Sequence, residues 1–122
     1  MVASAPQLKK FQKELNAGLV SLVLLAVIER DGGPLYGYQI AKQLEKSDAA
    51  LFVGKQSALY PVLRNMSAAG LLNSWVEPSV SGPPRRYYRI TDAGRTALDG
   101  WQTIWEDTRS FVDAMLDGEI DD

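Results

Sequence analysis

Four polar side chains fall on one face of a helix predicted over residues 55–70. They are an amide, a hydroxyl, a phenol and a guanidinium: Gln56, Ser57, Tyr60 and Arg64. Such groups can hydrogen-bond to base edges in the DNA major groove and can hold phosphates. The opposite face is apolar, with the i, i+3, i+4, i+7 spacing of a helix: Leu59, Val62, Leu63 and Met66. An ordinary surface helix has the same two faces, so the neighbouring elements must decide between the interpretations.

The composition limits the chemistry that the chain can perform. At 122 residues it is long enough for one domain, or for one domain with an appended helix. It contains no cysteine and no histidine. Disulfides, thiolate nucleophiles, Cys/His metal sites and histidine acid–base catalysis are therefore excluded. The carboxylates and lysines are not grouped at a strand end or on a glycine-rich loop, so we expect neither an enzyme nor a cofactor.

The net charge of −2 conceals an uneven distribution along the chain. Residues 1–95 carry 12 Lys and Arg against 7 Asp and Glu, whereas residues 96–122 carry only Arg109 against 8 acidic residues. The longer part can meet phosphate while the acidic end stays away from it. Double-stranded DNA is therefore a compatible partner despite the negative total.

The chain is expected to be cytoplasmic, with no membrane partner. Its longest apolar run, Leu19–Ile28, is far shorter than the roughly 20 residues that a membrane span needs. Lysines precede this run, as in a signal peptide, but no small-residue cleavage site follows it. Residues 29–31 are instead typical of a helix end.

Two short helices around a loop form the predicted helix-turn-helix. They are preceded by a longer helix, which runs from Leu8 to about Arg30 after a frayed segment 1–7 and ends at a turn over residues 31–34. A second helix covers 36–46 and a loop covers 47–54, ahead of the helix over 55–70. The second helix turns Tyr36, Ile40, Ala41 and Leu44 inward. Tyr38 and Lys42 lie on its outer side and are weaker candidates for phosphate contact.

A β-hairpin is predicted directly after Gly70. Residues 72–77 and 85–90 alternate with a period of two on either side of a turn-rich tip at 78–84. A hairpin in this position is a wing. Arg85 and Arg86 flank its tip and can reach phosphates or an adjacent minor groove, as Lys55 can from the helix. The alternative is that these arginines serve solubility alone.

The last predicted helix begins after an N-cap at Thr91 and runs to about Leu116. Its apolar stripe is a heptad seam too wide to be buried on a core of about 85 residues. We therefore expect a homodimer in which the last helix of each subunit packs on its mate and on the first helix. The predicted interface includes Leu98, Trp101, Ile104, Trp105, Thr108, Phe111, Val112 and Met115.

With these elements placed, the chain resembles the short-tailed branch of the PadR family of bacterial transcriptional regulators. Four motifs carry the resemblance, in the family's order and spacing: Leu35-Tyr-Gly-Tyr-Gln-Ile40, Ala58-Leu-Tyr-Pro-Val-Leu63, Ala69-Gly-Leu-Leu72 and Arg85-Arg-Tyr-Tyr-Arg-Ile-Thr-Asp-Ala-Gly94. The resemblance implies a dimeric repressor that binds an inverted-repeat operator. The family usually has Gly-Thr before Leu-Tyr-Pro, whereas this chain has Ser57-Ala58, so its operator preference is expected to differ.

The resemblance also implies a place for an effector. In some short-tailed relatives, a tryptophan at the position of Trp105 lines a pore between subunits that holds flat hydrophobic compounds. Trp101 lies one helical turn earlier. We hypothesise that a small planar aromatic or phenolic effector binds near these two residues. The alternative is that both indoles are interface core alone.

The predicted fold class is mainly α with a small β-hairpin, a winged helix-turn-helix followed by a long dimerisation helix. The winged domain is expected over residues 1–91 and the dimerisation helix over 92–118. The predicted function is a sequence-specific DNA-binding regulator, a repressor released by an effector. A winged-helix module that binds only other proteins stays as the alternative.

Overall fold

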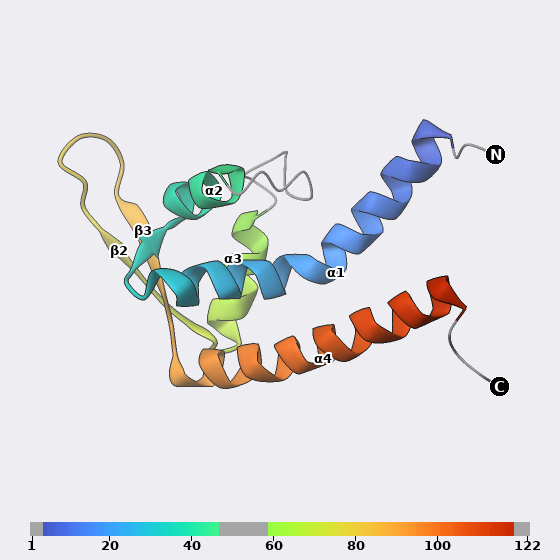
Figure 1. Cartoon of the computed structure of the whole chain (residues 1–122). Helices are drawn as coiled ribbons and strands as arrows, with labels where there is room; N and C mark the ends of the chain where they lie inside the picture. Colours follow the sequence, from blue (N-terminus) through green and yellow to red (C-terminus); the bar gives the residue numbers. More distant parts are fainter. Residues whose placement is uncertain (1–3, 47–58, 119–122) are drawn as a thin grey trace.

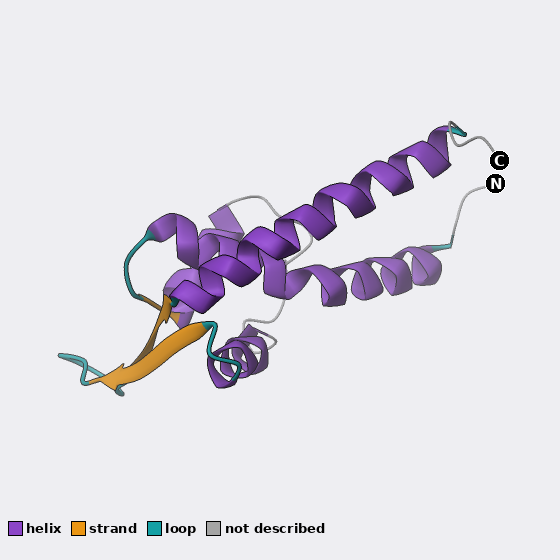
Figure 2. Cartoon of the chain, turned by 90° about the horizontal axis from the view of Figure 1, so that it is seen from below, coloured by secondary structure: helices purple, strands orange, loops and turns teal. Residues whose placement is uncertain are grey.

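The computed structural model describes residues 4–46 and 59–118, which form a small winged domain with two long helices extending from it (Figure 1). The elements in chain order are α1 (Ala5–Asp31), β1 (Leu35–Tyr36), α2 (Gly37–Lys46), α3 (Leu59–Ala68), β2 (Leu72–Glu77), β3 (Arg85–Ile90) and α4 (Asp92–Asp117). Figures 1 and 2 show α1 and α4 leaving the domain on the same side, so that the first residues of α1 and the last residues of α4 lie far from the wing. The predicted fold class is confirmed.

The first helix begins earlier than predicted. Ser4 is its N-cap and Gln7 closes a capping box: Gln7 N donates to Ser4 Oγ at 3.3 Å, and Ser4 N donates to Gln7 Oε1 at 3.0 Å. Pro6 fits in the first turn, where a missing N–H costs nothing. The expectation of a frayed start is therefore wrong for residues 4–7. At the other end, Asp31 closes the helix and the Gly32 N–H donates to the carbonyl of Ile28.

The core of the winged domain forms around the second half of α1. Leu24, Leu25 and Ile28 are its buried residues. They pack with buried side chains from α2, α3 and the sheet: Leu35, Ile40, Leu44, Leu63, Met66, Leu72, Tyr88 and Ile90. By length and hydropathy alone, α1 could cross a membrane, the single such helix in the described part of the chain. The second half of α1 lies in this core, whereas Leu8 and Phe11 in its first half are exposed in the single chain.

A third strand, β1, completes the sheet that the sequence predicted as a hairpin. All pairs are antiparallel, in the order β1-β3-β2. Leu35 pairs with Tyr88, and Tyr36 pairs with Tyr87. Placing Tyr36 inside the second helix was therefore wrong, because that helix begins at Gly37. A strand of two residues is too short to give a periodic signal.

The two faces of α3 are divided as the sequence predicted. Leu63 and Met66 are buried, and Leu59 and Val62 are half-buried on the same side. The helix ends at Ala68, and Gly70 in the turn that follows has a left-handed φ of 81°. The loop over residues 47–54 and the start of the predicted helix, with Lys55, Gln56 and Ser57, lie outside the described residues.

The Thr91 side chain ties α4 to the end of α3. Its Oγ1 accepts a hydrogen bond from Gly94 N at 2.9 Å and donates one to the carbonyl of Gly70 at 2.7 Å. The predicted N-cap is confirmed, and it has a second partner that the sequence did not indicate. The angle at which α4 leaves the domain is thereby fixed by a bond to the end of α3.

Candidate nucleic-acid interface

The outer face of α3 presents a phenol and a guanidinium. Tyr60 is 37% exposed and Arg64 is also exposed. Both side chains lie on the side of α3 away from the core, as the apolar spacing predicted. Because the other predicted α3 contacts, Lys55, Gln56 and Ser57, lie outside the described residues, the geometry of the site rests on Tyr60 and Arg64.

A hollow of about 630 Å³, here the wing hollow, lies between α3, the start of α2 and the wing. Five of the predicted DNA-binding residues line it: Tyr38, Tyr60, Arg64, Arg85 and Arg86. Lys42, the sixth predicted residue in the described part of the chain, lies beside it, with its Nζ 5.4 Å from the centroid of the Tyr38 ring. Residues from three separate segments of the sequence thus meet on one surface.

The start of α2 shapes this surface through a glycine. A Cβ added at Gly37 would come 2.5 Å from Cε1 of Tyr60, so the Tyr60 ring lies close against the backbone there. No other residue type fits without moving the ring. Gly37 therefore leaves the space that the Tyr60 ring occupies, a role that the sequence analysis missed.

The three arginines of the wing hollow form no ion pair with any carboxylate in residues 4–46 and 59–118. The described part of the chain contains three ion pairs, which join Lys42 to Glu45, Arg95 to Asp92 and Arg109 to Asp113. None involves Arg64, Arg85 or Arg86. Arg86 instead donates to Ser74 Oγ at 3.1 Å. Guanidinium groups placed in this way can form charge-assisted hydrogen bonds to phosphate oxygens.

Tyr88 forms the buried floor of the wing hollow. It is 3% exposed, and this burial raises the pKa of its phenol above the ordinary value, although Arg86 and Arg64 oppose the shift. The phenol is therefore neutral at physiological pH. On the rim, a hydrogen bond with Tyr38 and then the charge of Glu45 raise the pKa of Lys42, which stays cationic.

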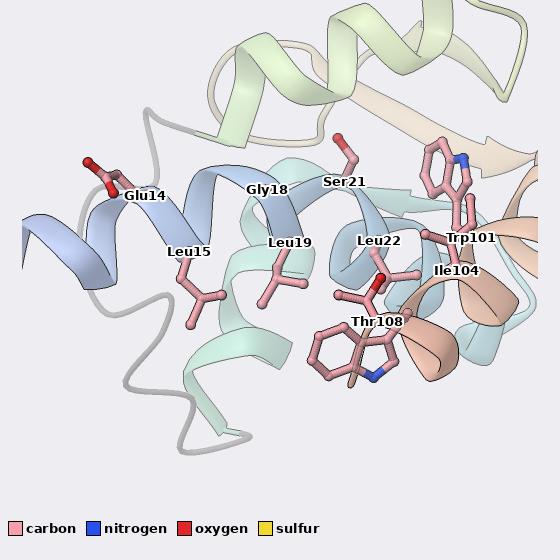
Figure 3. Close-up of a pocket in the computed structure, with 10 residues that line it drawn as sticks. Glu14, Leu15, Gly18, Leu19, Ser21, Leu22, Trp101, Ile104 and Thr108 are labelled. Carbon is pink, nitrogen blue, oxygen red and sulfur yellow. The ribbon is translucent and has the colours of Figure 1, made fainter. Parts of the chain in front are cut away.

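The predicted effector residues line a different hollow, of about 450 Å³, between α1 and α4, here the α1–α4 hollow. Trp101 and Trp105 contribute to it from α4. Leucines of α1 form the opposite side, and Figure 3 shows Leu15, Leu19 and Leu22 on that helix. The sequence predicted that the last helix packs on the first, but it named none of the α1 residues that line this hollow, because contacts between two helices distant in sequence leave no local pattern. Glu14 is the single charged residue in the lining.

The apolar seam of α4 becomes more exposed along the helix. Leu98 and Trp101 are half-buried against the core, whereas Ile104 and Phe111 are 63% and 60% exposed. The remaining predicted interface residues are exposed as well: Trp105, Thr108, Val112 and Met115. Among the described elements, α1 is the main neighbour of α4.

A short helix pair followed by a hairpin that bears cations defines the winged helix-turn-helix class, a DNA-binding architecture. Residues 24–100 match the transcriptional regulator PadR-like family, and the chain belongs to that family. It is therefore a transcriptional regulator and not an enzyme, as the sequence predicted.

Solved structures and a curated relative resemble the chain over most of its length. A PadR family transcriptional regulator from Eggerthella lenta is 28% identical, with a TM-score of 0.75 over 91% of this chain and 93% of that one. An uncharacterised protein from Lysinibacillus sphaericus is 26% identical over 104 residues, which are 85% of this chain and 93% of the relative. The fold is also that of Bacillus subtilis PadR in complex with operator DNA, 21% identical, with a TM-score of 0.61 over 69% of this chain and 46% of that one.

Proposed function

We propose that this regulator is a cytoplasmic repressor that binds an inverted-repeat operator as a homodimer. The observation that carries the proposal is the wing hollow, where Arg64, Arg85 and Arg86 converge and form no ion pair with a carboxylate among the described residues. In this arrangement α3 enters the major groove, and the wing grips the backbone or the adjacent minor groove.

Base reading is assigned to the outer face of α3. Arg64 can form a bidentate contact to guanine, and Tyr60 offers a hydroxyl beside it. Gln56 and Ser57, four and three residues before Tyr60 in the sequence, are proposed to read the neighbouring bases. Lys55, Tyr38 and Lys42, with the two wing arginines, are proposed to hold phosphates. That Bacillus subtilis PadR has the same fold and is bound to operator DNA supports this assignment.

The two-fold arrangement rests on the exposed seam of α4. We assign residues 1–91 to the winged domain and 92–118 to a dimerisation helix that packs on its counterpart and on α1. Exposed apolar residues such as Ile104, Phe111 and Met115 would be covered by a second copy rather than by lipid. Two copies would then place two α3 helices about one turn of DNA apart.

An effector is proposed for the α1–α4 hollow. Two indoles and the leucines of α1 form a largely apolar lining that suits a planar aromatic or phenolic compound. Binding there would lower operator affinity, because α4 sets the spacing of the two winged domains. Packing at the dimer interface remains the alternative role of Trp101 and Trp105.

A winged module that binds only proteins is the second candidate. Among the described residues, the wing hollow is lined by arginines, tyrosines and prolines, whereas a protein-binding version would show an apolar patch of Leu, Ile or Phe. Salt separates the two functions, because phosphate contacts release counterions and DNA affinity falls steeply with ionic strength.

Binding-site selection from random double-stranded DNA tests the proposal. The expected result is one enriched palindrome with half-sites about one helical turn apart. Recovery of unenriched DNA at low salt, from folded protein, would contradict sequence-specific binding. An enriched single half-site would contradict the dimer and leave the DNA assignment intact.

A further inference from the structure

Four aromatic rings form a continuous row from the wing into α2. Trp75 on β2 stacks on Tyr87 of β3, with ring centroids 6.2 Å apart. Tyr87 meets Tyr36 of β1 edge to face at 5.5 Å, and Tyr36 stacks with Tyr38 of α2 at 6.5 Å. Tyr36 therefore sits at the centre of the row, where the sheet joins the helix-turn-helix.

Arg85 lies on this row rather than on its neighbouring carboxylate. Its partner across the antiparallel ladder is Glu77, which is placed for a cross-strand ion pair. The Glu77 Oε1 instead accepts a hydrogen bond from Trp75 Nε1 at 3.0 Å. The guanidinium carbon of Arg85 lies 4.5 Å from the centroid of the Tyr36 ring, within cation–π distance.

The Tyr36 ring is itself fixed on several sides. It is half-buried, and Tyr87 and Tyr38 contact it from two directions. Its backbone N–H donates to Gln39 Oε1 at 3.1 Å, which anchors the residue to the first turn of α2. A ring held in this way is a rigid platform, whereas an arginine at the edge of a hairpin would otherwise sample many rotamers.

We propose that Tyr36 is a positioning residue for DNA binding, which holds the Arg85 guanidinium on the wing hollow before DNA arrives. The inference rests on the proposed function. It adds Tyr36 to the residues that determine DNA affinity, although Tyr36 acts through Arg85 and makes no DNA contact of its own. A side chain ordered in advance loses less rotamer entropy when it meets a phosphate, so the platform raises affinity without a further contact. It also keeps Arg85 away from Glu77, which would neutralise it.

A double-mutant cycle on the selected operator tests the coupling. The proteins are the natural chain, Tyr36→Leu, Arg85→Ala and the double variant. Tyr36→Leu is expected to weaken binding by about two- to five-fold, the range of an exposed cation–π contact. In the Arg85→Ala background the same change is expected to have no further effect, because the residue that it positions is absent. Additive losses in the double variant would overturn the proposal.

The salt dependence of binding separates positioning from direct contact. Arg85→Ala is expected to reduce the slope of log affinity against log salt by about 1, since one phosphate contact is lost. Tyr36→Leu is expected to leave the slope unchanged, because Arg85 still reaches the phosphate. Tyr36→Phe keeps the ring face and is expected to bind like the natural chain. A loss on Tyr36→Phe equal to that on Tyr36→Leu would assign the effect to the hydroxyl and contradict the platform.

A measurement on the unaltered protein covers the case in which Tyr36→Leu does not fold. The Arg85 δ-protons, lying over an aromatic face, are expected to show upfield ring-current shifts in the NMR spectrum without DNA. Shifts at the ordinary positions would overturn the inference. Failure of the natural chain to select any DNA would instead count against the proposed function, and the ring-current result would still decide whether Arg85 lies on Tyr36.

Discussion

The ring of Tyr60 lies against Gly37, so closely that a single added carbon would collide with it. Tyr60 is on α3 and Gly37 is the first residue of α2. The contact therefore joins the two helices of the helix-turn-helix at the surface proposed to meet DNA. The Tyr60 ring can take this position because Gly37 has no side chain.

Gly37→Ala is expected to weaken operator binding by displacing Tyr60. The new Cβ would lie 2.5 Å from Cε1 of Tyr60, so the ring must move away. The expected cost is about 1–3 kcal/mol if the Tyr60 hydroxyl contacts a base. Fluorescence anisotropy with labelled operator measures it. Gly33→Ala is the matched control, since its Cβ would meet only Asp31 Oδ2, at an ordinary 3.6 Å. If Gly37→Ala and Gly33→Ala bind the operator with equal affinity, the position of Tyr60 does not contribute to DNA binding.

Arg64→Ala distinguishes base reading from phosphate holding. A bidentate base contact predicts a loss of about 1–3 kcal/mol on the operator and a smaller loss on scrambled DNA. A phosphate contact predicts equal losses on both. Arg89→Ala, on an exposed arginine of β3 outside the lining of the wing hollow, provides the control. Unchanged binding to both DNAs after Arg64→Ala would remove Arg64 from the interface.

Thr91→Val is expected to destabilise the protein by about 1–2 kcal/mol, because it removes an N-cap and a bond to the Gly70 carbonyl. Urea unfolding at fixed protein concentration measures the loss. Thr91→Ser retains the hydroxyl and should recover most of the stability. A valine variant as stable as the natural chain would show that the bridge between α3 and α4 is replaced by water at no cost.

Phe111→Glu is expected to convert the proposed dimer to a monomer. Phe111 is 60% exposed in the single chain, and a carboxylate in its place could not be buried without a partner. Analytical ultracentrifugation reports the mass. Ser110→Glu adds the same charge at an adjacent exposed position outside the predicted seam. If the Phe111→Glu protein is still a dimer, Phe111 does not lie in the interface between the subunits.

Planar dyes and phenolic acids are expected to quench tryptophan fluorescence through the α1–α4 hollow. The chain has 3 tryptophans, and Trp75 lies on the wing. In a Trp75→Phe background, Trp101 and Trp105 become the reporters, and both line the hollow. Leu19→Gln, on the opposite α1 side, should reduce the quenching. No quenching across the panel would leave both indoles as interface core.

Local patterns in the sequence were sufficient for most of the elements. The spacing of Leu59, Val62, Leu63 and Met66 predicted which face of α3 is buried, and Thr91 predicted the start of α4. The two-residue strand at Leu35–Tyr36 was missed because pairing with Tyr87 and Tyr88, far along the chain, creates it.

Contacts between distant segments explain what could not be predicted of the site. Tyr36 was expected on the inner side of a helix, yet its ring lies beneath Arg85, nearly fifty residues later in the chain. The α1 side of the α1–α4 hollow depends in the same way on tertiary packing. Spacing along a helix could place Tyr60 and Arg64 on one face, but it could not place Gly37 against Tyr60.

Gly18 divides α1 into a first half that contributes only to the α1–α4 hollow and a second half that also carries the folding core. All the buried core residues of the helix, Leu24, Leu25 and Ile28, come after it, as do Leu19, Ser21 and Leu22 of the α1–α4 hollow, whereas Glu14 and Leu15 of that hollow come before it. Substitutions at residues 14 and 15 are therefore expected to change binding of the proposed effector without disturbing the folding core. Changes at residues 21–28 would confound specificity with stability. Variants confined to the first half of α1 are therefore expected to change specificity without changing the stability of the core.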